Sequence, residues 1–357
     1  MENSNFNTET PEKESVGYEE PGVINAPQPR YVTYIPYGFT PKTFEEKKGI
    51  KKAALLSGLA LITIMAIADF WVIIYYLVMS FFGFTPERAQ AIITEPAVLQ
   101  VAQIFLSTFM FTVPFILIFK AGGRCISDLV PLKKPTGSKT AMFFIGLSFC
   151  AFANIASSYC GYFFESIGID YNVDFGDNPD GFFGFLLSLL ATAIVPALVE
   201  EFACRGIILG VLRKYGDGFA VLVSAILFGL MHGNFDQMPF ALMVGLVLGY
   251  IVVKTESLWI AVAVHATNNF ISVAFTYILC GFSQNAQNLI YLIYLMAALT
   301  AGIIAAVTVK GEESFKFNKS DTESTLKQKF KWFFSSVPVV IFVILCLLQS
   351  IKFFKVV

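Results

Sequence analysis

The chain has 357 residues, of which 56% are hydrophobic and only 14% are charged, and its formal net charge is -1. Soluble domains carry about 25% charged residues, so this composition excludes an ordinary water-soluble protein and favours one whose surface meets lipid. Six cysteines occur without a CxxC pair or a regular spacing, which argues against a disulfide framework or a zinc knuckle. We expect the chain to lie in the lipid bilayer and to bind no nucleic acid.

The N-terminal segment differs from the rest of the chain. Residues 1–50 are polar and contain six prolines, and we expect no cleavable signal peptide among them. Such a stretch cannot bury enough apolar surface to fold by itself. The sequence therefore predicts a disordered cytoplasmic tail over residues 1–50.

Nine later stretches are long and apolar enough, or nearly so, to cross a membrane as a helix of about 20 residues. The fifth and sixth stretches are short, and Gly233 and Pro239 lie at the boundary between them. Either a tight turn joins the two stretches or they are partly re-entrant. The predicted fold class is all-α, a polytopic transmembrane helix bundle of about eight or nine membrane helices. The stretches lie at roughly 53–82, 97–119, 140–167, 182–211, 218–232, 238–253, 257–280, 287–309 and 333–352.

These stretches define the expected domain boundaries. The transmembrane bundle covers residues 51–310, with a core at about 140–280 that carries most of the unusual polar residues described below. A charged cytoplasmic linker follows at 311–332, and an extra C-terminal membrane helix lies within 333–357.

The Lys and Arg residues are concentrated in the loops on one side of the predicted membrane. With the N-terminus in the cytoplasm, the segments on that side hold 21 of the 25 Lys and Arg residues. The loop at 168–181, on the other side, holds four Asp residues and no Lys or Arg. An excess of Lys and Arg is typical of cytoplasmic loops, so the pattern predicts an N-terminus inside and a C-terminus outside. We expect an integral multi-pass protein of the bacterial plasma membrane.

Ionisable residues are rare in the predicted membrane segments, where each costs about 2.5–3.5 kcal/mol by insertion scales and usually marks function. Asp69 and Glu165 are isolated. The others fall in three groups, EEFACR at 200–205, FGLMH at 228–232 and HATNN at 265–269. The two histidines of the chain both lie in these groups.

Helix geometry relates the residues within each group. Residues four apart share a helix face, so Glu201 can pair with Arg205, and His265 can aim at the same point as Asn269. Glu200 points about 100° away from Glu201 and is left without that partner. Counted at about 1.5 Å per residue from the cytoplasmic ends, His265, Glu200 and His232 lie at depths of roughly 12, 20 and 21 Å. All three can therefore meet in the inner half or the middle of the membrane.

Each residue also has a plain structural interpretation. A single buried carboxylate can be a structural hydrogen-bonding group, a lone histidine a satisfied core residue, and a Glu-Arg pair a brace within a helix. The convergence of all three groups on the membrane interior favours a functional site.

At these positions the sequence resembles the CPBP family, which comprises the CAAX prenyl endopeptidases of the Ras-converting type and related bacterial bacteriocin-processing and self-immunity membrane proteins. The family pattern reads EExxxR, FxxxH and HxxxN on successive membrane helices. EEFACR, FGLMH and HATNN match it in order. The resemblance covers about 140–280 and does not extend to the tail, the first two helices or the last one.

The resemblance implies an intramembrane endopeptidase acting on a peptide or protein substrate in the membrane. Glu200 would be the general base that activates a water molecule, and His232 would hold that water. His265 and Asn269 would donate hydrogen bonds to the developing oxyanion. We expect water to reach such a site from the cytoplasm.

The remaining motif residues and the cofactor follow from the same resemblance. Glu201 and Arg205 would brace the helix and position Glu200. The family has been described both as metal-dependent and as metal-independent. Glu200, His232 and His265 could form a three-ligand zinc site with an open position, although the metal-independent interpretation is favoured.

Two alternatives remain open from the sequence. The chain could be a non-catalytic immunity or scaffold protein of the same fold, or a transporter with Glu200 and the histidines as a proton relay. No inverted repeat is evident, which lowers the weight of the transporter. The substrate and the oligomeric state are not defined by the sequence.

Overall fold

The computed structural model describes residues 35–170, 176–309, 316–317, 320–353 and 355–356. The chain divides into two units, Met1–Phe39 and Thr40–Val357, and the second unit is the helix bundle. Most of the expected N-terminal tail lies outside the described residues. Its last part does not, because the first helix begins at Pro41 rather than after residue 50.

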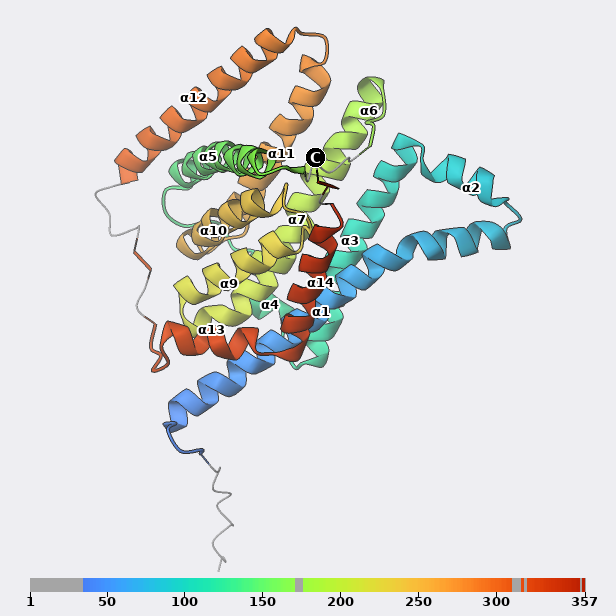
Figure 1. Ribbon diagram of the computed structural model, residues 1–357. Coiled ribbons are helices and arrows are strands. Elements are labelled where there is room, and N and C mark those ends of the chain that lie inside the picture. Colours follow the sequence, from blue (N-terminus) through green and yellow to red (C-terminus); the bar gives the residue numbers. More distant parts are fainter. Residues whose placement is uncertain (1–34, 171–175, 310–315, 318–319, 354, 357) are drawn as a thin grey trace, which may run out of the picture. The chain divides into compact units, whose positions relative to one another are not determined.

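The second unit is built almost entirely from helices, which confirms the predicted fold class (Figure 1). The first half contains α1 (Pro41–Phe81), α2 (Pro86–Ile93), α3 (Pro96–Ala121), α4 (Ile126–Leu129), α5 (Lys139–Ser166), β1 (Ile169–Asp170), α6 (Gly181–Ser188), η1 (Leu189–Ile194), α7 (Val195–Glu201), η2 (Phe202–Ile208) and α8 (Leu209–Leu212). The second half contains η3 (Arg213–Tyr215), α9 (Asp217–Leu230), α10 (Met238–Thr255), α11 (Trp259–Leu279), α12 (Gln284–Val309), α13 (Leu326–Phe334), α14 (Val337–Ile351) and β2 (Lys355–Val356).

The only sheet among the described residues is a two-residue antiparallel pairing of β1 with β2. It joins the segment after α5 to the end of the chain.

Seven described helices are long and apolar enough to cross a membrane, and the pair α13 and α14 would make an eighth span. That pair is bent by 77°, so the predicted ninth helix is a shorter span preceded by a separate helix. The expected fifth span corresponds to α9, whose 14 residues are too few to cross a bilayer as a straight helix. The structure thus agrees with the lower end of the predicted count.

Local sequence signals explain where several helices begin. Thr40 caps α1 by accepting a hydrogen bond from the backbone N–H of Thr43, and Pro41 follows at the first helical position. Thr325 and Gln328 form the same reciprocal cap at the start of α13. These caps place ordered helix inside both the expected tail and the expected charged linker.

Two close helix contacts require glycine. A Cβ atom on Gly58 of α1 would lie 2.7 Å from Cβ of Pro338 on α14, and one on Gly302 of α12 would lie 2.1 Å from Cβ of Ser148 on α5. Neither space admits a larger residue without movement, so these glycines let the paired helices approach closely.

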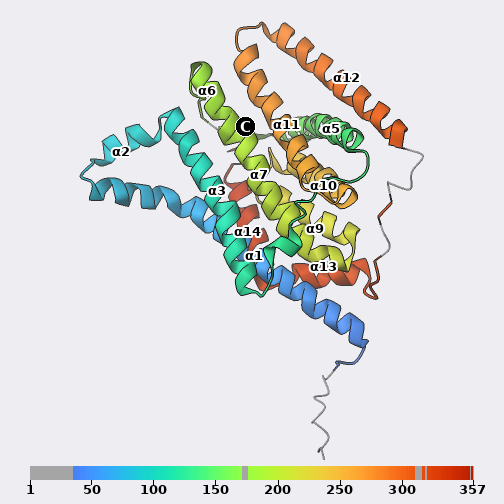
Figure 2. The same ribbon diagram turned by 180° about the vertical axis from the view of Figure 1, so that it is seen from behind.

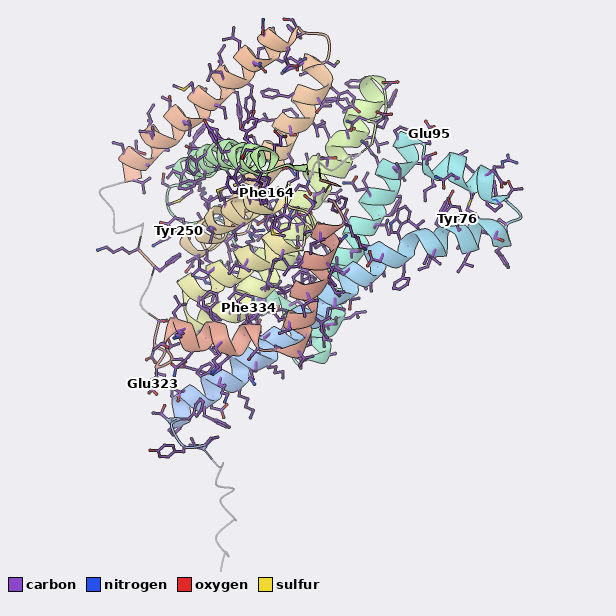
Figure 3. All side chains as sticks on the ribbon, viewed as in Figure 1. Tyr76, Glu95, Phe164, Tyr250, Glu323 and Phe334 are labelled. Atoms are coloured by element: carbon purple, nitrogen blue, oxygen red, sulfur yellow. The ribbon has the colours of Figure 1, made fainter. Side chains whose placement is uncertain are left out.

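The polar and apolar residues are distributed as a membrane environment requires. Large apolar side chains on α1, α12 and α14 point away from the bundle (Figure 3), and many of them are exposed. The buried core surrounds η2, α8 and α9, and it includes the fully buried charged residues Glu201 and Arg205. Tyr76 near the end of α1 turns toward α2, where its hydroxyl donates to the side-chain oxygen of Gln90 (Figure 3).

The helical segment from Gly181 to Tyr215 passes through the centre of the bundle, and both views show α7 between α3 and α11 (Figures 1 and 2). Two π-helical turns, η1 and η2, interrupt its α-helical geometry on either side of α7. Such turns inside helices occur frequently at functional sites.

Candidate active site

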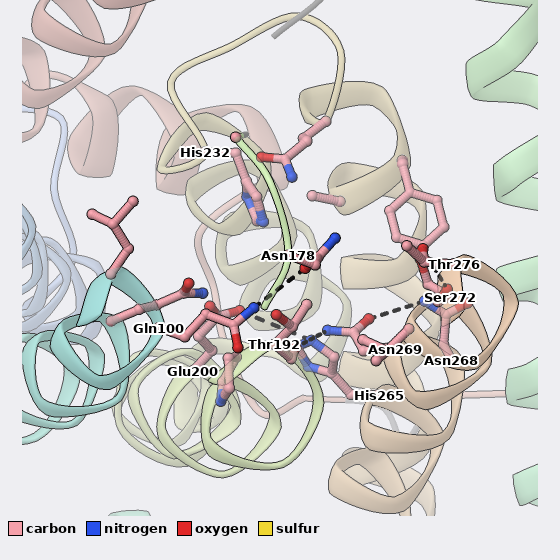
Figure 4. A pocket seen from close by; sticks show the side chains of 18 of the residues that line it. Gln100, Asn178, Thr192, Glu200, His232, His265, Asn268, Asn269, Ser272 and Thr276 are labelled. Atoms are coloured by element: carbon pink, nitrogen blue, oxygen red, sulfur yellow. Dashed lines mark hydrogen bonds and ion pairs between the residues drawn. The ribbon is translucent and has the colours of Figure 1, made fainter. Parts of the chain in front are cut away.

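A cavity of about 620 Å³ lies between α3, α7, α9, α10 and α11. Its lining includes four of the predicted site residues, Glu200, His232, His265 and Asn269 (Figure 4). The structure therefore brings together one side chain or more from each of the three motifs. Glu201 and Arg205 do not line the cavity.

Glu201 and Arg205 form an ion pair directly behind this cavity. The Nη1 atom of Arg205 donates to Oε1 of Glu201 at 2.9 Å, and both side chains are completely buried. The pairing predicted from the four-residue spacing is confirmed. It leaves the neighbouring Glu200 to face the cavity instead.

The ion pair also holds His265. The Nδ1 atom of His265 lies 2.9 Å from Oε1 of Glu201. An ionised carboxylate can only accept, so Nδ1 carries the proton of this contact and Nε2 faces outward. Nε2 lies 4.0 Å from Oε2 of Glu200. In this tautomer His265 can donate to an oxyanion only after Nε2 has also gained a proton.

His232 follows the end of α9 and is oriented by the backbone. Its Nδ1 atom lies 2.8 Å from the carbonyl oxygen of Phe228, which can only accept, so Nε2 is left as an acceptor. That nitrogen is suited to accept a hydrogen bond from a water molecule in the cavity.

Phe228 connects the two histidines to the buried pair. Its ring packs edge-on against the rings of His232 and His265, with centroid distances of 5.1 and 6.1 Å. The guanidinium of Arg205 lies over the same ring, 4.0 Å from its centroid. This arrangement explains why an aromatic residue suits the first position of the FxxxH motif.

Asn269 is positioned by a proline in the neighbouring helix. Pro196 has no N–H, so it cannot donate to the carbonyl of Thr192 four residues earlier. The side-chain amide of Asn269 donates to that carbonyl at 3.0 Å. An amide nitrogen carries two hydrogens, so one remains available to the cavity.

Further side-chain donors reach carbonyls in both π-helical turns, η1 and η2. Gln103 on α3 donates to the carbonyl of Ala191 at 3.2 Å, and Ser224 on α9 donates to that of Cys204 at 2.8 Å. Backbone carbonyls released by the irregular helix are thus satisfied from neighbouring helices, as burial in a membrane requires.

Polar residues outside the motifs also line the cavity. The side-chain amide of Gln100 donates to Asn178 at 3.2 Å and to Ser188 at 2.8 Å. The hydroxyl of Tyr277 donates to the carbonyl of Pro179 at 2.6 Å. These bonds hold Asn178 against α3 and Pro179 against α11, and Figure 4 shows the contact between Gln100 and Asn178.

Sequence reasoning did not identify these polar lining residues or the contact between Asn269 and Thr192. Pro196 inside an apolar span was the one available signal, since it predicts an unpaired carbonyl at Thr192. Which side chain would satisfy that carbonyl depends on the packing of α11 and could not be derived from the local sequence.

The three possible zinc ligands are not gathered as a metal site. Within the described residues, no three His, Cys, Asp or Glu side chains lie close enough together to hold a metal ion. The set of Glu200, His232 and His265 therefore does not fit that role in this arrangement.

The fold and the site together define an integral multi-pass membrane protein with a polar cavity inside its helix bundle. Residues 182–271 match the family described as type II CAAX prenyl endopeptidase, Rce1-like. This match includes all three motifs and confirms the resemblance to the CPBP family.

A curated relative supports the same assignment. Over 84 residues the chain is 27% identical to the "Putative membrane peptidase YdiL" of Bacillus subtilis (strain 168), which covers 23% of this chain and 34% of that protein. The chain thus spans about a third of the length of this relative. No solved structure matches the chain. The comparisons support a membrane peptidase without defining its substrate.

Proposed function

We propose that this protein is an intramembrane endopeptidase of the bacterial plasma membrane, acting on membrane-associated or C-terminally processed peptides and proteins. The observation that carries the proposal is the shared cavity of Glu200, His232, His265 and Asn269. Glu200 is free for chemistry there because Arg205 is committed to Glu201. A family match alone would not distinguish an active enzyme from a relative that keeps only the fold.

The chemistry assigns a step to each group. Glu200 accepts a proton from water as the water oxygen attacks the peptide carbonyl, and His232 accepts that water's second hydrogen bond. The free N–H of Asn269 donates to the oxygen of the tetrahedral intermediate, joined by His265 when its Nε2 is protonated. Glu200 then returns the proton to the leaving nitrogen as the C–N bond breaks. The products are a carboxylic acid and an amine, which leave as carboxylate and ammonium once the acid proton has passed to the amine.

The buried pair acts on this site indirectly. Glu201 fixes the ring of His265, and Arg205 neutralises Glu201 while packing against Phe228. We therefore assign Glu201 and Arg205 as positioning residues.

The proposal is tested by quantitative peptidomics of membranes that contain wild-type protein or Glu200→Gln. We expect a defined set of uncleaved peptides or proteins to accumulate with Glu200→Gln. Glu87→Gln is a matched control, because Glu87 is an exposed glutamate of α2 that lies outside this cavity. Identical peptide profiles for wild type and Glu200→Gln, with full complementation by Glu200→Gln, would instead support a non-catalytic immunity or scaffold protein.

The cofactor question needs a separate measurement. We propose hydrolysis without a metal, since the three possible zinc ligands are not gathered. Cleavage by the purified protein should persist after treatment with 1,10-phenanthroline. Loss of cleavage that is restored by added zinc would show that these residues rearrange around a metal.

A further inference from the structure

The cavity is placed asymmetrically along the bundle. From Glu200 it extends toward the N-terminal end of α3 at Pro96, the segment 176–178 before α6 and the C-terminal part of α11 at Tyr277. These segments lie at the end of the bundle where α1 finishes and α2 is found (Figures 1 and 2). The opposite end, where α1, α5 and α9 begin, contributes none of the described lining residues.

The two ends of the bundle differ sharply in charge. The starts of α1 and α5 and the segments beside α8 and α13 carry most of the Lys and Arg residues of the described bundle. The cavity end carries Arg88 and Lys352, together with Asp177, Asp180 and Asp236. The excess of Lys and Arg marks the cytoplasmic side, so the cavity extends toward the other face. A water path from the cytoplasm, as expected from the sequence, is not what this cavity provides.

The lining of the cavity is suited to a peptide backbone. Amide and hydroxyl side chains on its walls can donate and accept at once, as an extended peptide requires. None of the described lining residues is Lys or Arg, so the cavity offers no permanently charged cation to pair with a terminal carboxylate. The amide and hydroxyl residues are Gln100, Gln103, Asn178, Thr192, Gln237, Asn268, Asn269, Ser272, Thr276 and Tyr277.

A second cavity of about 510 Å³ continues from the first. Gln237, Phe240 and Ser272 line both cavities. The second is otherwise polar, and its charged residues are the carboxylates Glu165 on α5 and Asp236 before α10. Burial raises the pKa of Asp236, and a cation beside it would offset that cost.

We infer that the substrate is an internal, neutral-to-basic peptide segment that enters from the non-cytoplasmic face and lies across both cavities. Its scissile bond sits beside Glu200, and a Lys or Arg side chain occupies the space between Glu165 and Asp236. A chain that ends in a free carboxylate just after the scissile bond is disfavoured, because Glu200 and Asp177 repel that charge. The inference rests on the proposed peptidase function, narrows its substrates to internal peptide segments, and adds the side of entry.

The substrate class is tested with three fluorogenic peptides on purified protein in detergent. One has blocked ends and lysines flanking an apolar centre, the second has glutamates in place of the lysines, and the third ends in a free carboxylate close behind the scissile bond. We expect the lysine peptide to be cleaved about tenfold or more faster than the other two, which corresponds to about 1.4 kcal/mol. The double variant Glu165→Gln/Asp236→Asn should reduce this preference while still cleaving a neutral peptide.

The outcomes separate the inference from the proposed function. Preferred cleavage of the glutamate peptide or of the free-carboxylate peptide, abolished in Glu200→Gln, would overturn the inference and leave the peptidase function standing. Equal hydrolysis of every peptide by wild type and Glu200→Gln would contradict the function itself.

The side of entry is tested with the lysine peptide and sealed vesicles. Right-side-out vesicles should cleave peptide added outside, whereas inverted vesicles should cleave it only after permeabilisation. The reverse result would overturn the side of entry. As an internal check, Thr276→Cys, exposed on the cavity wall, should react with a membrane-impermeant thiol reagent only in right-side-out vesicles.

Discussion

At the scale of single residues, the site depends on which polar groups are already paired with one another and which remain available to the cavity. Arg205 is committed to Glu201, and Glu201 holds His265, so Glu200 keeps its carboxylate for the cavity. Pro196 has no N–H to donate to the carbonyl of Thr192, so one amide hydrogen of Asn269 forms that hydrogen bond instead. Catalytic geometry in this account therefore arises from buried contacts that never touch the substrate.

Pro196→Ala tests the positioning of Asn269. Alanine restores an N–H to the carbonyl of Thr192, and the amide of Asn269 then loses its fixed partner. We expect kcat to fall about tenfold, or ~1.4 kcal/mol in the barrier, with little change in KM. Pro114→Ala is the control, because Pro114 is buried inside α3 and does not line the cavity. An unchanged kcat for Pro196→Ala would show that Asn269 is held by other contacts.

Arg205→Leu tests the buried pair. It leaves Glu201 as an uncompensated buried charge, which typically costs about 3–5 kcal/mol. We expect a clear loss of thermal stability in detergent, measured by size-exclusion chromatography after heating. The double variant Glu201→Gln/Arg205→Leu should recover part of that loss, because no buried charge remains. A double variant less stable than Arg205→Leu would argue against this explanation.

The residue-level predictions from sequence succeeded where the interaction lies within one helix. The four-residue spacing was enough to pair Glu201 with Arg205 and to direct Glu200 elsewhere. It could not reveal that His265 reaches across to Glu201, because that contact spans 64 positions and depends on how α11 packs. The catalytic roles themselves stay predictions until they are measured.

At the scale of helices, α13 shows how long-range contacts override composition. The charged sequence before residue 333 predicts a linker, yet Glu46 of α1 accepts hydrogen bonds from the backbone of Glu323 and Ser324 at 3.0 Å each. Lys329 donates to the carbonyl of Tyr215 at 2.6 Å. These contacts hold α13 beneath the bundle, and no local pattern could have indicated partners so distant in the chain.

Glu46→Ala tests this attachment. It removes the acceptors of two backbone N–H groups near the start of α13, which should cost about 1–3 kcal/mol. We expect a lower melting temperature and faster proteolysis near residue 320. Glu45→Ala is the matched control, since Glu45 is exposed while Glu46 is buried. Equal stability of the two variants would mean that α13 is held chiefly by its apolar face.

At the scale of the whole molecule, the account requires a defined orientation in the membrane. The chain carries a natural pair of markers, because Cys125 and Cys280 are both exposed and lie toward opposite ends of the bundle. With the N-terminus inside, an impermeant maleimide added to intact cells should label Cys280 and leave Cys125 unlabelled until lysis. Cys280→Ser and Cys125→Ser identify each signal. Labelling of Cys125 in intact cells would show that the orientation is the opposite one, and the cavity would then be reached from the cytoplasmic side.

The fold class and the approximate spans could be predicted because apolar length is a property of the sequence alone. The position of the cavity could not, because counting residues gives depth within one helix but not the direction in which side chains leave a gap. Glu200 was expected to draw water from the basic side, and the described cavity extends the other way.

The most direct test of the central claim is hydrolysis by purified protein in H₂¹⁸O, with a peptide that accumulates in Glu200→Gln membranes as substrate. We predict that wild type and Glu87→Gln release a product with one ¹⁸O atom in its new carboxylate. Glu200→Gln should be slower by about 10²-fold or more, since a general base typically contributes 10²–10⁴. Hydrolysis by Glu200→Gln at the wild-type rate would contradict the account.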